Sequence, residues 1–178
     1  MVVIFDLDGT LANITHRRHH VDPKLRDDVY LWIDSSTGKE YWLYLDDVSY
    51  PKSRVRWKPN WDAFYQACDQ DTPNQPICSI IRLLFYAGSK VMIWSGRSDV
   101  VREKTEQWLE NHCLSDIPLK MRKDKDYTPD VELKEKWLDE YLDSGGEPIS
   151  MVIDDRQRCV DMWRRRGLTC LQVAPGNF

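Results

Sequence analysis

Near its start the chain reads Phe5-Asp6-Leu7-Asp8-Gly9-Thr10-Leu11. This stretch follows an apolar run and places two carboxylates, at i and i+2, where a strand would break into a loop. Side chains two apart on a strand share a face, so Leu7 is expected to point into the core while Asp6 and Asp8 emerge together. Gly9 lets the backbone turn away sharply. We therefore expect both acids at the carboxyl end of a strand, where open α/β sheets bind ligands.

Apolar runs alternate with helical patterns along the rest of the chain. Continuous apolar runs that end in polar residues lie at 2–5, 91–94 and 151–153, with weaker ones at 119–121 and 170–173. Such runs suit a parallel sheet that is covered on both faces. Helical patterns lie at 76–87, 98–112, 128–142 and 156–166. The alternation predicts an α/β fold, a Rossmann-like parallel sheet of about five strands flanked by helices, and Thr128-Pro129 is typical of a helix start.

The stretch from Lys24 to Trp57 differs from this pattern. Its runs at 30–33 and 41–45 are rich in aromatic and β-branched residues and flank a Ser-Ser-Thr-Gly turn, which predicts a β-hairpin. We interpret 24–57 as a small lid inserted into one domain that spans 1–178. The aromatic side chains of the hairpin could stack on nucleic-acid bases or pack against their own sheet.

Composition narrows the function classes. The 178 residues carry a net charge of −4, so binding to a polyanion would need a local basic patch, and the one concentrated basic run is 16–20. That run is either a solvated loop or part of a site. The five cysteines show no metal-binding spacing, and no apolar stretch approaches the roughly 20 residues that span a bilayer. We expect a soluble cytoplasmic protein with reduced thiols and no membrane partner.

Two further polar groups follow apolar strands, Ser95-Gly96-Arg97 and Asp154-Asp155. The carboxyl ends of parallel strands open on one edge of the sheet, so both groups are expected to converge with Asp6 and Asp8. The four carboxylates, Asp6, Asp8, Asp154 and Asp155, would repel one another unless a cation lay among them. Mg²⁺ is the cation that this oxygen-rich set favours.

Lys134 is expected one turn into the helix that begins near Thr128, with Asp130 four residues before it. Residues at i and i+4 share a helix face, so the two side chains can pair. Such a pair is common on solvated surfaces. Lys134 also comes after Ser95 and before Asp154 in the chain. In that place its ammonium could bind a phosphoryl oxygen and an attacking carboxylate at the same time.

The order Asp-x-Asp-Gly-Thr, then Ser, then Lys, then Asp-Asp resembles the haloacid dehalogenase superfamily. The resemblance implies that Asp6 is a nucleophile that forms an aspartyl phosphate and that Asp8 is the general acid and then the base. It also implies that Asp154 binds the metal, that the Asp8 backbone carbonyl reaches it, and that Ser95 and Lys134 bind phosphate. An acid at Asp8 suits a phosphatase, since it can protonate a leaving oxygen.

A narrower resemblance, to the phosphatase domain of the phage polynucleotide kinase-phosphatase family, covers 1–18 and 61–178 but not the insertion. It implies hydrolysis of 3′-phosphates on nucleic-acid ends or nucleotides, and it makes Arg17, Arg97, Asp130 and Asp155 active-site residues. The chain has no G-x-x-x-x-G-K-[ST] motif, so we expect no kinase domain in it.

Two other functions stay open on the sequence. A general nucleoside monophosphatase would use the same catalytic residues. A phospho-acceptor signalling module also groups Asp, Ser or Thr, and Lys around Mg²⁺, but a leaving-group acid such as Asp8 has no use in it.

Overall fold

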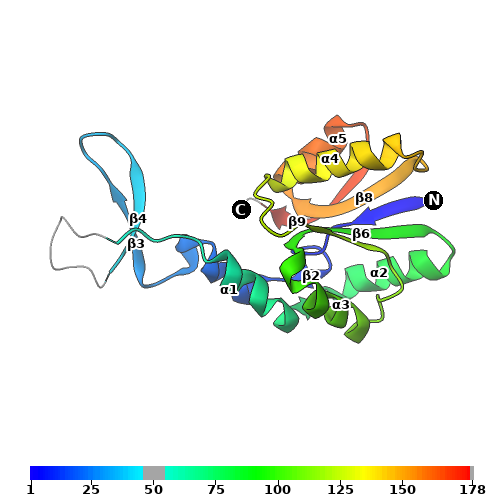
Figure 1. Ribbon diagram of the computed structural model, residues 1–178, viewed down its shortest axis with the longest axis horizontal. Coiled ribbons are helices and arrows are strands. Elements are labelled where there is room, and N and C mark those ends of the chain that lie inside the picture. The colour runs from blue at the N-terminus through cyan, green and yellow to red at the C-terminus, as the bar shows by residue number, and fades with distance from the viewer. Residues whose placement is uncertain (46–54, 177–178) are drawn as a thin grey trace. The chain divides into compact units, whose positions relative to one another are not determined.

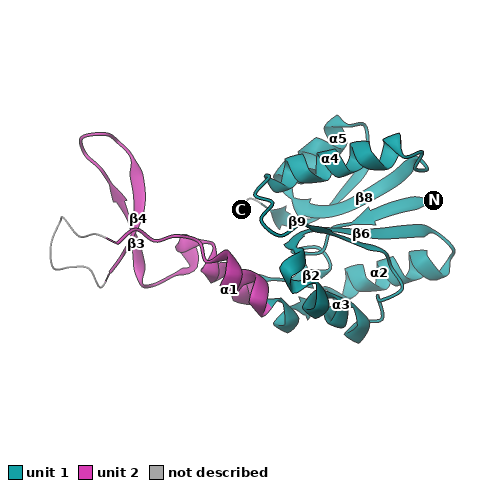
Figure 2. Ribbon diagram, viewed as in Figure 1, with its two compact units in different colours: residues 1–14, 68–178 teal, residues 15–67 magenta. Residues whose placement is uncertain are grey.

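A computed structural model describes residues 1–45 and 55–176, and the part of the predicted insertion at 46–54 lies outside the described residues. The chain forms two compact units, one made of 1–14 and 68–178 and the other of 15–67 (Figure 2). Among the described residues, no helix is long and apolar enough to cross a membrane.

The first unit is built on a five-stranded sheet, which confirms the predicted α/β fold (Figure 1). All its neighbouring strands are parallel, in the order β7-β6-β1-β8-β9. Their bounds are β1 Val2–Phe5, β6 Lys90–Ser98, β7 Leu119–Arg122, β8 Ile149–Arg156 and β9 Cys170–Gly176. The first motif strand, β1, therefore lies in the middle of the sheet, between the strands that carry the other two polar groups.

Helices cover both faces of this sheet, with α4 and α5 on one side and α2 and α3 on the other (Figure 1). They are α2 Gln75–Tyr86, α3 Arg102–Asn111, α4 Asp130–Asp143 and α5 Gln157–Arg165. Short elements complete the unit: β2 Ala12–Asn13, η3 Ala67–Gln70, β5 Thr72–Pro73 and η4 Asp99–Val101. Because both faces are covered, the central strands need apolar residues at every position.

The pleat of β1 divides its side chains between two cores. Val3 and Phe5 belong to the core beneath α2 and α3, whereas Val2 and Ile4 belong to the core beneath α4 and α5. Leu7 continues the first set and is fully buried, as predicted. This alternation fixes the direction in which the next polar residues of the strand leave the sheet.

The helix that carries Lys134 starts differently from the prediction. Thr128 does not cap it: α4 begins at Asp130, Pro129 precedes it, and no side chain caps it. The Thr128 N–H instead bonds to Asp126 Oδ1 at 2.9 Å, and the Thr128 carbonyl accepts from Arg122 at 2.5 Å. These bonds hold Thr128 in the loop.

The second unit contains the predicted β-hairpin. Its strands, β3 Val29–Ile33 and β4 Glu40–Tyr44, pair antiparallel with Trp32 opposite Tyr41, and these two rings stack at 5.8 Å. The other elements of the unit are η1 Thr15–His20, η2 Pro23–Leu25 and α1 Trp61–Gln66. The hairpin therefore belongs to a unit, 15–67, that extends beyond 24–57 on both sides.

Candidate active site

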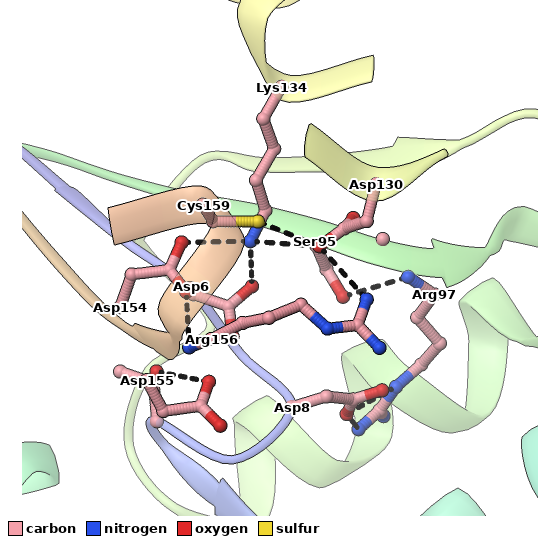
Figure 3. A network of polar contacts seen from close by, with 12 residues as sticks. Asp6, Asp8, Ser95, Arg97, Asp130, Lys134, Asp154, Asp155, Arg156 and Cys159 are labelled. Atoms are coloured by element: carbon pink, nitrogen blue, oxygen red, sulfur yellow. Dashed lines mark hydrogen bonds and ion pairs between the residues drawn. The ribbon is translucent and has the colours of Figure 1, made fainter. Parts of the chain in front are cut away.

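The ends of three adjacent strands bring the predicted polar groups together at one edge of the sheet (Figure 3). Asp6 follows β1, Ser95-Gly96-Arg97 lie at the end of β6, and Asp154-Asp155 lie at the end of β8. The register aligns Phe5 with Ile153, so the acids that follow these two residues leave neighbouring strands at the same level. The convergence expected from a parallel sheet is therefore present.

Three of the four predicted metal ligands form a compact acidic cluster. Asp6, Asp154 and Asp155 are buried, and each offers an oxygen within 4.8 Å of the others. Burial raises the pKa of Asp6 well above its usual value, and the Lys134 ammonium only partly offsets this. Burial and then the Asp154 charge raise the pKa of Asp155 to about 6. An all-carboxylate set with excess negative charge fits a hard divalent cation such as Mg²⁺.

Lys134 lies among these acids. Its Nζ is 2.7 Å from Asp6 Oδ1, 3.0 Å from Asp154 Oδ2 and 3.4 Å from Asp130 Oδ2, so the i, i+4 pair is buried in the site. Although burial alone lowers the pKa of Lys134, the Asp130, Asp154 and Asp6 carboxylates raise it well above its usual value. The ammonium is therefore charged at every physiological pH.

The Asp8 carboxylate lies outside the acidic cluster and pairs with Arg97. Arg97 Nε donates to Asp8 Oδ1 at 3.1 Å, and Nη2 bonds to the same oxygen and to Asp71 Oδ2, the latter at 2.8 Å. Arg97 Nη1 donates to Thr105 Oγ1 at 3.2 Å. Trp108 in turn donates to the Asp71 carbonyl at 2.7 Å. Asp8 is thus held by a buried arginine, and metal binding through its backbone carbonyl stays a prediction.

The loop after β6 fits closely against the start of α4. Ser95 is buried, and its Oγ accepts the Arg97 N–H at 3.2 Å. A Cβ at Gly96 would lie 2.1 Å from Asp130 Oδ1, so only glycine allows this approach. Arg122 ties the two segments together, because its Nε donates to the Gly96 carbonyl at 2.7 Å and its Nη2 lies 3.7 Å from Asp130 Oδ1.

Sequence reasoning missed Asp71, Thr105 and Arg122. Each lies among other polar residues and outside any motif, and each acts by holding a neighbour that does belong to one. No spacing signals them. Their burial is visible only once the fold is known.

Arg17, which the sequence placed in the active site, belongs to the second unit. Its guanidinium is buried against Phe64, 4.1 Å from the ring centroid, and Nη1 donates to the Phe64 carbonyl at 3.2 Å. The basic run 16–20 forms η1. A role for Arg17 in binding the substrate phosphate, which the family resemblance implies, stays a prediction.

The parallel sheet and the acid–lysine site together define a phosphatase of the haloacid dehalogenase class. A family model described as the polynucleotide kinase PNKP phosphatase domain matches residues 59–178, more than half of the chain. The chain belongs to this family.

Solved structures agree with this assignment. A chain in the Pnkp1/Rnl/Hen1 RNA repair complex is 27% identical with a TM-score of 0.65, matched over 99% of this chain and 43% of that one. A chain in a second structure of the Pnkp1/Rnl/Hen1 complex is 30% identical with a TM-score of 0.67, matched over 99% of this chain and 46% of that one. This chain thus spans less than half the length of those chains. A haloacid dehalogenase-like hydrolase from Streptococcus pneumoniae, 11% identical with a TM-score of 0.54 over 96% of this chain and 83% of that one, shows the fold alone.

The buried pair of Lys134 and Asp130 generates a test of coupling. Lys134→Ala should lower kcat by about a hundredfold or more, the scale expected when a preorganised charge is removed from a transition state. Asp130→Ala should cost less, because it only releases Lys134, and the double variant should be little worse than Lys134→Ala. Lys136→Ala, on the exposed face of α4, is the matched control and should keep wild-type kcat. Losses in kcat that multiply strictly in the double variant would contradict the coupling.

Proposed function

We propose that this phosphatase is a Mg²⁺-dependent phosphomonoesterase that works through an aspartyl phosphate and acts on 3′-phosphorylated nucleic acid or nucleotides. The observation that carries the proposal is the buried Asp6 carboxylate, held 2.7 Å from Lys134 and within 4.8 Å of two further acids. A carboxylate nucleophile divides a difficult hydrolysis into two easier displacements. The family match supports the substrate class.

The residues take distinct parts in this reaction. Asp6 attacks phosphorus, the bond to the leaving oxygen breaks, and Asp8 gives its proton to that oxygen. Asp8 then takes a proton from the water that attacks the phosphorus and releases Asp6. Arg97 holds Asp8 at the strand end through Nε at 3.1 Å. Lys134 screens the anionic phosphoryl group from the anionic nucleophile throughout, which lowers the barrier to their approach.

Asp6, Asp154 and Asp155 are the side chains that would hold Mg²⁺. When bound, the ion supplies positive charge that offsets the carboxylates and orients the phosphoryl oxygens. Trp163 Nε1 donates to Asp154 Oδ2 at 3.1 Å, so one of these acids is oriented by the core beneath it. Such bonds to metal ligands fix the ligand geometry.

A phosphate-release screen tests the substrate. It compares 3′- and 5′-phosphorylated mononucleotides and oligonucleotides, with Mg²⁺ and after chelation. We expect release from the 3′-phosphates, loss of release on chelation and recovery when Mg²⁺ is added back. Preference for free mononucleotides of either kind would favour the general nucleoside monophosphatase instead. Stable protein phosphorylation without turnover would favour the phospho-acceptor module.

The two lead aspartates should respond differently to amidation. Asp6→Asn should abolish turnover, since an amide is neither an adequate nucleophile nor a strong Mg²⁺ ligand. Asp8→Asn should slow turnover by roughly a hundredfold or more, the scale of general acid–base catalysis. Asp143→Asn, at the exposed end of α4, controls for the loss of a charge. If folded Asp6→Asn kept a tenth of wild-type activity, the covalent mechanism would be wrong.

The hairpin insertion is proposed to sense the leaving group. Its flanks are already joined, because Asn60 N–H donates to the His20 carbonyl at 2.8 Å, so 24–57 can be replaced by a short Gly/Ser linker. We expect the deletion to spare kcat/KM for a small aryl phosphate far better than for a nucleotidyl substrate, because only the larger molecule would reach a lid. Equal proportional losses, in a variant that still unfolds cooperatively, would show that the segment is only structural.

A further inference from the structure

Arg156 stands beside the acidic cluster but was not among the expected site residues. It ends β8 directly after Asp154-Asp155, and its backbone N–H donates to Asp154 Oδ1 at 3.1 Å, so its main chain is fixed to the site. Its side chain runs across the site from the Asp154 side toward Ser95 and Arg97 (Figure 3). There Nη1 lies 3.5 Å from Asp130 Oδ2.

The cations of the site differ in how far they are open to solvent. The side chains of Lys134 and Arg97 are 2% and 0% exposed. Lys134 forms an ion pair with Asp6, and Arg97 forms ion pairs with Asp8 and Asp71. The Arg156 side chain is 33% exposed. Its distance to Asp130 exceeds the roughly 2.7–3.2 Å of a hydrogen bond, so the pair is a loose one. Of these three cations, only Arg156 can meet an incoming anion without leaving the core.

Asp130 would not be stranded if Arg156 exchanged it for another anion. The same oxygen, Oδ2, lies 3.4 Å from Lys134 Nζ and accepts from Cys159 Sγ at 3.3 Å. Both contacts can persist while the guanidinium moves. Asp130 would therefore lose less if Arg156 moved than would the acid of a buried ion pair that has a single partner.

We propose that Arg156 binds two non-bridging oxygens of the phosphoryl group that is transferred to Asp6. This inference rests on the proposed function and adds a substrate-binding residue to it. The planar fork of a guanidinium matches two phosphate oxygens, which a lysine ammonium cannot do. The Arg156 guanidinium is also linked to the nucleophile by a short chain of contacts. Arg156 lies near Asp130, Asp130 contacts Lys134, and Lys134 contacts Asp6.

Inorganic phosphate and a small aryl phosphate test the inference, because neither depends on nucleic-acid recognition. Arg156→Gln should raise the orthophosphate inhibition constant and the KM for the aryl phosphate by about tenfold to a hundredfold, the scale of a charge-assisted hydrogen bond. The fall in kcat should be smaller. Arg156→Lys should recover only part of the binding, since it restores charge without the fork. Arg158→Gln removes the same charge from an exposed position on α5 and should match wild type.

Two results would overturn the inference. An unchanged orthophosphate constant in folded Arg156→Gln would show that Arg156 does not bind the phosphoryl group. A kcat loss like that of Lys134→Ala at unchanged KM would assign it to positioning Asp130. Failure of the proposed function looks different: wild type would release phosphate from the aryl substrate but not from 3′-phosphorylated nucleotides. If the wild-type protein turned over no substrate, orthophosphate binding to wild type and to Arg156→Gln would be compared by calorimetry in Mg²⁺. Equal binding would again overturn the inference.

Discussion

The ion pair between Lys134 Nζ and Asp6 Oδ1, 2.7 Å long and almost wholly removed from solvent, sets the conditions for the rest of the site. Burying an ammonium and a carboxylate costs several kcal/mol per ion, so geometry must be held by something other than the pair itself. Apolar packing supplies that hold. The side chains that seat α4 on the sheet are Leu133, Trp137 and Leu138. They precede and follow the lysine in the chain, so the helix cannot dock without bringing Lys134 to the strand ends.

Excess negative charge is the second constraint. Asp6, Asp130 and Asp154 contact one ammonium, and Asp155 lies beside Asp6 and Asp154. Burial and then the Asp154 charge raise the pKa of Asp155 to about 6. A site of this kind attracts cations and would repel a phosphate dianion. It can accept both only if positive charge arrives from a metal ion and from a side chain at its rim. This balance agrees with the proposed division, in which the buried Lys134 and Arg97 hold carboxylates and the half-buried Arg156 binds the substrate.

The sequence alone predicted those parts of the fold and site that follow from general patterns of strands, helices and turns. The sheet, the convergence of β1, β6 and β8, and the hairpin follow from apolar runs, strand direction and composition. Thr128 was predicted to start the helix and does not, because its N–H bonds to Asp126 and its carbonyl accepts from Arg122, both within the six residues before it. Asp71 gave no signal, since nothing local distinguishes an aspartate that will orient a buried Arg97 from one that will face solvent. Partners distant in sequence decide such residues.

At two glycines a carboxylate lies so close to the backbone that a side chain would not fit. A Cβ at Gly9 would lie 2.2 Å from Asp155 Oδ2, and one at Gly96 would lie 2.1 Å from Asp130 Oδ1. Gly9 also has φ of +91°, a conformation that L side chains rarely adopt. Any larger residue would push an acid away from the strand ends, and Asp130 would take its contact with Lys134 with it. The absence of a side chain at these two glycines is therefore what lets Asp155 lie beside Asp6 and Asp154 and lets Asp130 reach Lys134.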